Sequence, residues 1–166
     1  LFDFIKFRSM VMDADGALER WKTENEKLYV QYLASNFKLA NDPRVTPIGR
    51  LIRRTSIDEL PQLINVLRGE MSLVGPRPEV PRYVAHYPAA LRDKVLSVRP
   101  GITDIASIEY RDESAVLARA ADPERAYIDE VLPHKLALAA SYVDQASVWL
   151  DIRLILRTIG AIVRSG

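Results

Sequence analysis

Two adjacent carboxylates, Asp58 and Glu59, are the residues of this sequence best suited to chemistry. Neighbouring hard oxygen donors fit a reaction in which one carboxylate attacks phosphorus while the other holds a divalent cation. Arg53 and Arg54 precede the pair closely, and guanidinium groups are well suited to binding phosphate. The sequence therefore indicates phosphoryl chemistry centred on Asp58 and Glu59.

The same residues also have a structural interpretation. Ser56 and Glu59 have the spacing of a capping box, in which the serine caps a helix and the glutamate reaches back to the serine N–H. Pro61 favours a later helix start with Asp58 as the cap, because a proline in the first turn removes no intrahelical hydrogen bond. In both cases the carboxylates lie at a helix N-terminus, which favours their ionised form and bound phosphate. The structural and chemical roles are compatible.

The composition limits the classes of function. The 166 residues predict a single domain, 1–166, that needs no disulfides. The lack of cysteine excludes thiolate catalysis and cysteine-ligated zinc, and the two histidines, His86 and His134, are too far apart in sequence to suggest a histidine-rich metal site. A net charge of +1, from 23 basic and 22 acidic residues, gives no global field for nucleic acid. Anion binding is therefore expected to be local.

The predicted fold is α+β, predominantly helical, with a small antiparallel β-hairpin or sheet. Residues 2–8 alternate partly between apolar and polar side chains and predict one strand, and residues 71–74 predict another. A type II turn over Arg99–Ile102, with glycine at its third position, is expected to lead into a strand or extended loop over residues 103–111. Helical spacing covers residues 13–40, 79–98, 112–145 and 147–164. A further helix is expected to open at Pro47 after a Thr46 cap, and another to run from Leu60 until Gly69 ends it.

Several arginines have spacings that suit phosphate. Arg50, Arg53 and Arg54 share one face of the helix that begins after Thr46, and either a solvated face or a phosphate clamp is consistent with that pattern. Arg77 lies between two prolines that restrict the backbone, so its guanidinium would be held ready for bidentate contact with phosphate. The simpler interpretation of Arg77 is an exposed side chain in a turn that ends a strand.

The C-terminal segment 147–164 has an apolar stripe beside a sector of arginines. A helix of this kind can lie in a membrane interface, with its arginines toward anionic headgroups. Packing against the domain core is the commoner role of such a stripe, and it is the favoured interpretation here. The stripe consists of Trp149, Ile152, Leu156, Ile159 and Val163, and the arginines are Arg153, Arg157 and Arg164.

A set of motifs occurs in order along the chain and is far more specific than any single one. Together they closely resemble the bacterial sugar transferase family, the monotopic phosphoglycosyl transferases that act on undecaprenyl phosphate. The resemblance is strong over residues 1–111 and weaker until about Tyr142. The motifs are Lys6–Met10, Asp42–Thr46, Arg53–Pro78, Arg99–Thr103 and Trp149–Ile152.

The resemblance implies the transfer of a sugar 1-phosphate from a nucleoside diphosphate sugar, typically a UDP-sugar, to a polyprenyl phosphate. It implies that Asp58 forms a covalent phosphosugar intermediate with release of UMP, and that Glu59, beside Asp58, helps to bind Mg²⁺. The residues that would contact phosphate or otherwise support activity are Lys6, Arg53, Arg77 and Arg111.

The resemblance also implies a location. Family members carry an N-terminal membrane segment that places the active site at the cytoplasmic face of the inner membrane. This chain is expected to begin inside the catalytic domain, without that segment. The sequence leaves open the sugar, the pathway product and the oligomeric state, including a homo-oligomer.

Two departures from the family pattern support an alternative. Asp104 and Tyr110 stand where many members have glycine, which adds bulk beside Arg111. Ala139 stands where the family has an aspartate, for which the candidate replacements are Asp129 and Glu130. A second hypothesis is therefore a catalytically inactive member that serves as an assembly platform on the membrane. A third, a nucleic-acid binder, is disfavoured by the net charge and by the lack of interleaved aromatic residues.

Overall fold

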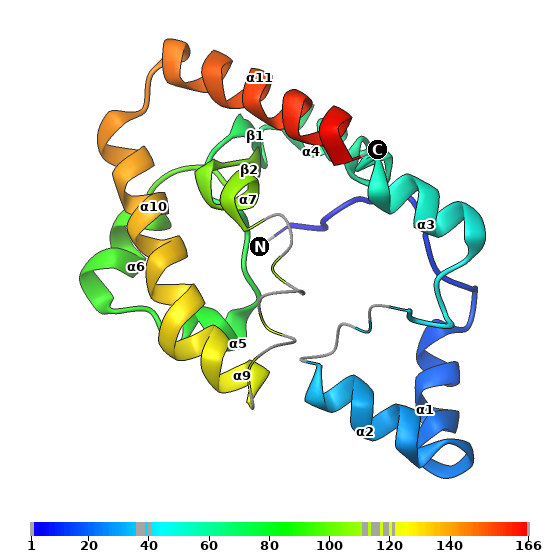
Figure 1. Ribbon diagram of the computed structural model, residues 1–166. Coiled ribbons are helices and arrows are strands. Elements are labelled where there is room, and N and C mark those ends of the chain that lie inside the picture. Colours follow the sequence, from blue (N-terminus) through cyan, green and yellow to red (C-terminus); the bar gives the residue numbers. More distant parts are fainter. Residues whose placement is uncertain are drawn as a thin grey trace.

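The fold is shown by a computed structural model that describes residues 2–35, 39, 41–110, 113, 117, 120 and 122–165 (Figure 1). Helices dominate, and one small sheet forms within these residues, which confirms the α+β class. The strands are β1 (Ser72–Val74) and β2 (Gly101–Thr103). The helices are α1 (Ala14–Glu24), α2 (Glu26–Ala34), α3 (Pro47–Arg54), the 3₁₀ turn η1 (Ile57–Glu59), α4 (Gln62–Leu67), α5 (Pro81–Val84), α6 (Ala89–Val95), α7 (Ile105–Glu109), α9 (Pro123–Ala126), the π-helical η2 (Tyr127–Val131), α10 (Leu132–Gln145) and α11 (Val148–Ser165).

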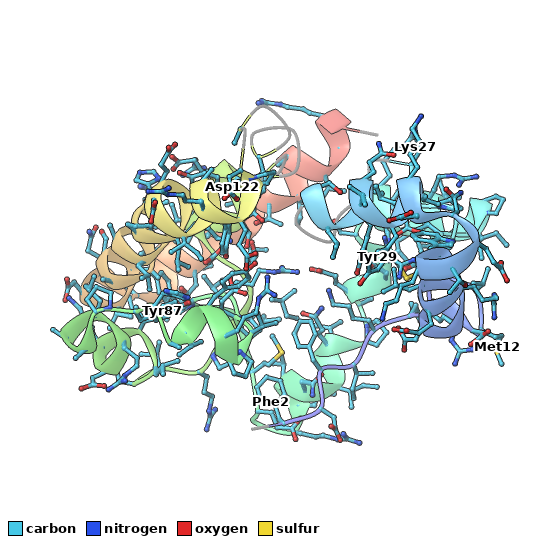
Figure 2. The ribbon with its side chains drawn as sticks, turned by 90° about the horizontal axis from the view of Figure 1, so that it is seen from below. Phe2, Met12, Lys27, Tyr29, Tyr87 and Asp122 are labelled. Atoms are coloured by element: carbon cyan, nitrogen blue, oxygen red, sulfur yellow. The ribbon has the colours of Figure 1, made fainter. Side chains whose placement is uncertain are left out.

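The elements surround the small sheet. The hairpin of α1 and α2 lies on one side, and α5, α6, α9 and α10 lie on the other (Figure 1). Seen from below, Lys27 and Tyr29 mark the hairpin side, while Tyr87 and Asp122 mark the α10 side (Figure 2). The long helix α11 runs over the sheet and contacts both strands.

The sheet is parallel, so the predicted antiparallel pairing is wrong. Ser72 lies opposite Gly101, and Val74 lies opposite Thr103. The connection between the strands contains α5 and α6, and such a helical crossover allows the second strand to run in the same direction as the first. The residue pattern of a short strand indicates an extended segment but not the direction of its partner. The direction here depends on the crossover.

Gly101 permits the strands to approach, but not as part of the predicted type II turn. That turn would need a positive φ at Gly101, and Gly69 is the glycine with a positive φ, 74°, among the described residues. A Cβ added to Gly101 would lie 2.1 Å from the backbone nitrogen of Gly75. The prediction was wrong because the glycine is needed for close backbone packing. Gly69 does follow the end of α4, as the sequence predicted.

Two predicted strands are absent from the described residues. Residues 2–8 form no strand, because their backbone bonds to other partners: the Phe7 N–H donates to the Asp58 carbonyl at 2.9 Å, and the Ile5 N–H to Asn65 Oδ1 at 3.3 Å. Residues 105–109 form helix α7 instead of an extended segment, because the Asp104 carboxylate caps it by accepting the Ser107 N–H at 2.6 Å. In both segments the backbone N–H groups bond to partners outside a strand ladder, which the alternation of side chains does not show.

Two apolar clusters hold the helices on the α10 side and over the sheet. The first joins α5, α6, η2 and α10 through residues such as Tyr83, Val95 and Leu136. The second joins β1, α10 and α11 through Val74, Tyr142 and Leu154. The Tyr142 hydroxyl also lies 3.2 Å from the Val74 carbonyl and 2.8 Å from Asp151 Oδ1, within hydrogen-bond distance of both. The cores therefore fix α10 and α11 relative to the sheet.

The apolar stripe predicted on the C-terminal helix does not pack against the core. Its five side chains are between 42% and 81% exposed, and Arg153, Arg157 and Arg164 are also exposed. The face of α11 that packs is a different one, with Leu154 1% exposed and Leu150 and Ile155 beside it. The favoured interpretation of the stripe was wrong because the helix has two apolar faces, of which the core takes one.

A buried ion pair links the α1–α2 hairpin to the chain that leads into α3. Asp42 and Arg44 side chains are each 6% exposed and form a two-pronged contact, with Arg44 Nη2 2.7 Å from Asp42 Oδ2. The Arg44 guanidinium lies 5.0 Å from the ring centre of Trp21 and 4.8 Å from that of Tyr32. Removal of the carboxylate would leave a buried cation without its partner.

We therefore expect Asp42→Asn to lower the free energy of unfolding by about 2–4 kcal/mol, measured by urea denaturation. The control is Asp13→Asn, which removes an exposed ion pair with Arg20 and should change stability by less than about 0.5 kcal/mol. Burial by itself raises the pKa of Asp42, but its bonds to Arg44 outweigh that and lower the pKa. The stabilisation is thus present above the ordinary aspartate pKa and is lost as the pH falls below it. Equal losses in the two variants would contradict this role.

Candidate active site

The carboxylate pair is positioned by a sharp turn after α3. Thr46 caps this helix by accepting the Gly49 N–H at 2.9 Å, and Pro47 occupies its first turn, as predicted. Ser56 then adopts a left-handed conformation with φ 56°, which redirects the chain into η1. Neither predicted cap forms: the Ser56 side chain makes no capping bond, and α4 begins only at Gln62. Asp58 and Glu59 therefore lie in a 3₁₀ turn between two helices.

Glu59 is held by two cations from distant parts of the sequence. Lys6 Nζ lies 3.0 Å from Glu59 Oε1, and Arg77 donates to both carboxylate oxygens, with Nη1 3.2 Å from Oε2. Burial alone would raise the pKa of Glu59, but Arg77 and Lys6 outweigh it and lower the pKa. Glu59 therefore stays ionised, and the positive charges of Lys6 and Arg77 balance its negative charge.

Asp58 differs from its neighbour in having no such partner. Its carboxylate forms no hydrogen bond or ion pair with another side chain in the part of the chain that the structure describes. Partial burial and the adjacent Glu59 raise the pKa of Asp58, while Lys6 and Arg53 act in the opposite direction. Of the two carboxylates, Asp58 is the one whose oxygens remain available to an incoming phosphorus atom.

Both the backbone and the guanidinium of Arg77 are held by hydrogen bonds. Its backbone N–H donates to Asp104 Oδ2 at 3.2 Å, and its Nη1 donates to the Ile102 carbonyl at 3.2 Å as well as to Glu59. Burial alone would lower the pKa of Arg77, but Glu59 and Asp104 raise it. The sequence predicted a restrained arginine from the flanking prolines. The structure adds that Asp104 restrains it too.

The other predicted phosphate contacts are only partly brought together. Arg53 Nε donates to Ser9 Oγ at 2.8 Å, and both Arg53 and Arg54 line the cavity that contains the carboxylate pair. Arg50, on the same face of α3, instead donates to the Val45 carbonyl at 3.2 Å. Arg111 lies outside the described residues, so its predicted role remains a prediction.

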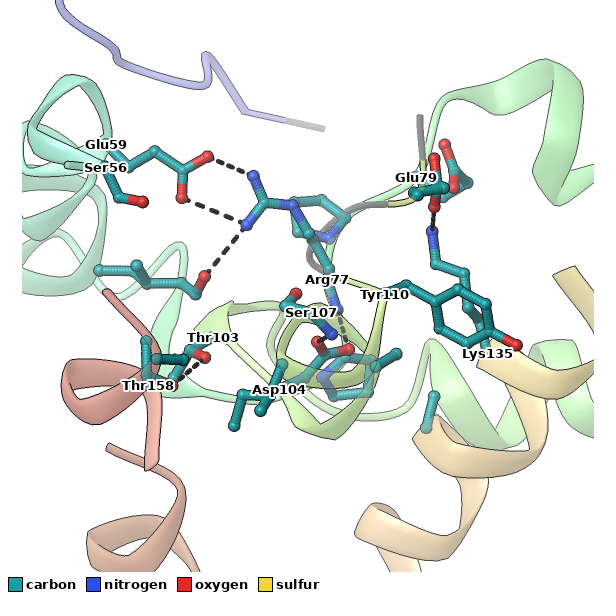
Figure 3. A pocket seen from close by; sticks show the side chains of 18 of the residues that line it. Ser56, Glu59, Arg77, Glu79, Thr103, Asp104, Ser107, Tyr110, Lys135 and Thr158 are labelled. Carbon is teal, nitrogen blue, oxygen red and sulfur yellow. Dashed lines mark hydrogen bonds and ion pairs between the residues drawn. The ribbon is translucent and has the colours of Figure 1, made fainter. Parts of the chain in front are cut away.

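The carboxylate pair lies in a cavity of about 1280 Å³ that extends well beyond it. Figure 3 shows Glu59 on one side of Arg77 and Glu79 with Lys135 on the other. Sequence reasoning missed this second polar cluster, because its members come from separate segments and form no motif. The third part of the cavity is an apolar wall from the turn after η1 and from α4, β1 and α11, lined by Leu60, Leu63, Leu73, Ile155, Ile159 and Ile162.

The sequence matches the family described as bacterial sugar transferase over residues 1–165. The chain belongs to this family.

Relatives within the family are somewhat more than a third identical to this chain over the aligned residues. The UDP-galactose-lipid carrier transferase of Erwinia amylovora is 37% identical over 163 residues, which are 98% of this chain and 30% of that protein. The undecaprenyl-phosphate galactose phosphotransferase of Salmonella typhimurium is also 37% identical, over 99% of this chain and 31% of its own length. The exopolysaccharide production protein ExoY of Rhizobium meliloti is 36% identical, over 99% of this chain and 65% of its own length. The chain thus spans about a third of the two galactose transferases.

The departures from the sugar transferase pattern have structural explanations. Asp104 caps α7 and restrains Arg77, so a carboxylate at this position supports the site directly. Tyr110 packs against His134, with its hydroxyl 2.7 Å from the ring Nδ1. Ala139 lines the cavity, whereas the candidate replacements Asp129 and Glu130 are exposed and are not among the lining residues. Those replacements are therefore wrong for this structure.

The donor atoms of Asp58 and Glu59 fit Mg²⁺, which commonly binds one or two carboxylates together with phosphate oxygens. Among the described residues there is no cluster of three or more acidic, histidine or cysteine side chains that could hold a metal ion alone. A cation bound by the two carboxylates would complete its coordination with water or phosphate oxygens.

Proposed function

We propose that the protein transfers a sugar 1-phosphate from a UDP-sugar to a polyprenyl phosphate. The observation that carries the proposal is the asymmetry of the pair: Glu59 is neutralised by Lys6 and Arg77, while Asp58 lies beside it without a described side-chain partner. The names of the relatives support an undecaprenyl-phosphate acceptor and a galactose or glucose donor.

In the first step, an Asp58 oxygen attacks the phosphorus that carries the sugar. The bond from that phosphorus to the bridging oxygen breaks, and UMP leaves with the electron pair. In the second step, a phosphate oxygen of the polyprenyl phosphate attacks the same phosphorus and displaces Asp58, which regains its negative charge. The product is a polyprenyl diphosphate sugar, and both steps balance without an oxidant or reductant.

Electrostatic repulsion is the main obstacle to the first step. Two unit negative charges ~4 Å apart at an effective dielectric constant of ~20 repel by about 4 kcal/mol, which is worth roughly a thousandfold in rate. Arg77 and Lys6 reduce this repulsion by placing positive charge beside the phosphate. When bound by Asp58 and Glu59, Mg²⁺ would neutralise the diphosphate oxygens and the developing charge on the leaving group.

The experiment that tests the proposal is a screen of UDP-sugars with the full-length protein in its membrane and undecaprenyl phosphate, with UMP release as the measurement. We expect release with at least one UDP-hexose. No release with any donor, under conditions where a related transferase is active, would favour the inactive assembly platform instead.

Because the proposed acceptor is a lipid, the protein must contact a membrane, and the exposed apolar face of α11 is the surface that we propose for this contact. None of the helices in the described residues is long and apolar enough to cross a bilayer. Ile159 on this face also belongs to the apolar wall of the cavity, together with Leu60 and Leu63. A lipid surface on this side would therefore bring a polyprenyl chain to the mouth of the cavity.

We expect the double variant Trp149→Gln, Leu156→Gln to bind vesicles of anionic phospholipid about tenfold or more weakly than the unchanged chain, because both side chains leave water on binding. Sedimentation of the 166-residue chain with vesicles measures this. The control is Val30→Gln on α2, which removes an exposed apolar side chain far from α11 and should leave binding unchanged. Equal loss in both variants would contradict a specific role for α11.

A further inference from the structure

We propose that Glu79, Glu113, Tyr127 and Lys135 form the subsite for the hexosyl ring of the donor. The proposal rests on the proposed function and names the part of the cavity that distinguishes one sugar from another. These residues come from the segment after β1, the chain that precedes α9, the π-helical η2 and helix α10.

The four side chains form one connected network at the wall of the cavity. The Tyr127 hydroxyl donates to Glu79 Oε2, and Lys135 Nζ lies 2.8 Å from Glu113 Oε2 and 3.3 Å from the Tyr127 hydroxyl. Each carboxylate oxygen can accept more than one hydrogen bond, and an ammonium group has three N–H donors. The network therefore holds its members in place and still offers acceptors and donors to hydroxyl groups.

The position of the network fits the donor. Glu79 follows Arg77 by two residues, and Figure 3 shows Glu79 and Lys135 on the side of Arg77 opposite to Glu59. A diphosphate held by Arg77 and Lys6 beside Asp58 would leave the groups attached to it to extend along the same cavity. The network is the polar surface that one of those groups would meet.

The negative net charge of the network favours an uncharged part of the donor over a phosphate group. Two carboxylates and one ammonium sum to −1, and burial together with Glu79 raises the pKa of Tyr127, so the phenol stays neutral. A negative cluster repels phosphate but accepts hydrogen bonds from hydroxyls. A hexosyl ring supplies more hydroxyls than the ribose of UDP does. It therefore satisfies this surface better than the nucleoside end.

Aromatic rings enclose the same region. Tyr127 is 3% exposed and packs against Tyr83 with the rings tilted by 54° and their centres 4.6 Å apart. Tyr87 also lines the cavity and is near both Glu79 and Asp104, and burial and these carboxylates raise its pKa to about 12. Flat apolar faces beside hydrogen-bonding groups are the combination expected of a small-molecule site. The partly exposed ring of Tyr87 would pack against the C–H face of a sugar ring.

The test uses Glu79→Gln and Tyr127→Phe, which keep side-chain size and change only hydrogen-bonding groups. Both are made in the full-length protein with the additional change Asp58→Asn, so that no turnover occurs. Calorimetry measures the Kd of UDP-glucose, UDP-galactose and UDP. We expect each variant to weaken the preferred UDP-hexose by about tenfold to a hundredfold and to leave UDP within about twofold.

The matched control is Glu124→Gln on α9, an exposed carboxylate paired with Arg82 that does not line the cavity. It should leave every Kd unchanged. A parallel loss of UDP and UDP-hexose would assign the network to the nucleoside end, and no change in any Kd would show a purely structural network. Either result overturns the proposal. Since binding is measured without turnover, failure of the subsite is distinct from failure of the transferase reaction.

Discussion

Asp58→Asn is expected to abolish phosphosugar labelling of the full-length protein incubated with Mg²⁺ and a radiolabelled UDP-hexose. An amide keeps the size of the carboxylate but is a far weaker nucleophile towards phosphorus, so we expect labelling and UMP release to fall by at least about a thousandfold. The fold should be unaffected, because the Asp58 side chain supports no other described side chain, and the hydrogen bond from Phe7 goes to its backbone carbonyl.

A matched control for this variant is Asp93→Asn, which changes an exposed aspartate on α6 outside the cavity. It should label as strongly as the unchanged protein. Circular dichroism and thermal unfolding would establish that the Asp58→Asn protein is folded. Labelling that persists in a folded Asp58→Asn protein would reject Asp58 as the nucleophile.

Arg77→Ala is expected to lower kcat/KM by about thirtyfold to a thousandfold, the equivalent of about 2–4 kcal/mol for a lost bidentate charge-assisted contact. The Arg77 guanidinium donates hydrogen bonds to Glu59 and to the Ile102 carbonyl. Its removal leaves Lys6 as the one cation paired with Glu59 among the described residues, and it also takes positive charge from the proposed phosphate site. The steady-state rate of UMP release measures the loss.

Arg77→Lys separates charge from geometry. A lysine keeps the positive charge but not the planar fork, so it should recover only part of the lost activity. The control is Arg92→Ala on α6, which removes an exposed arginine paired with Asp93 and should leave kcat/KM within about twofold. Full activity of Arg77→Lys would show that charge alone matters at this position.

Local chemistry in the sequence predicted the features that depend on near neighbours. Thr46 with Pro47 predicted the start of α3, and Gly69 predicted the end of α4. The adjacent carboxylates, the arginine between two prolines and the order of the motifs identified the family, which the comparison confirmed. Each of these signals lies within a few residues of the chain, where backbone preference and covalent spacing decide the outcome.

Contacts between distant residues could not be predicted in this way. The direction of β2 depends on the crossover through α5 and α6, and the shape of residues 2–8 depends on partners at Asp58 and Asn65. The network of Glu79, Tyr127 and Lys135 joins residues that form no motif, since Glu79 lies 48 residues before Tyr127.

The sequence by itself determined the family and the residue types available at the candidate site, because the order of the motifs and the identity of their side chains do not depend on the fold. Only the tertiary structure decided how the two carboxylates differ. Lys6 lies 53 residues before Glu59 in the sequence and Arg77 lies 18 residues after it, yet both pair with its carboxylate. Asp58 has no such side-chain partner among the described residues. The physical reason is that ion pairs depend on distance in space, which the packing of the chain sets and its order of residues does not show.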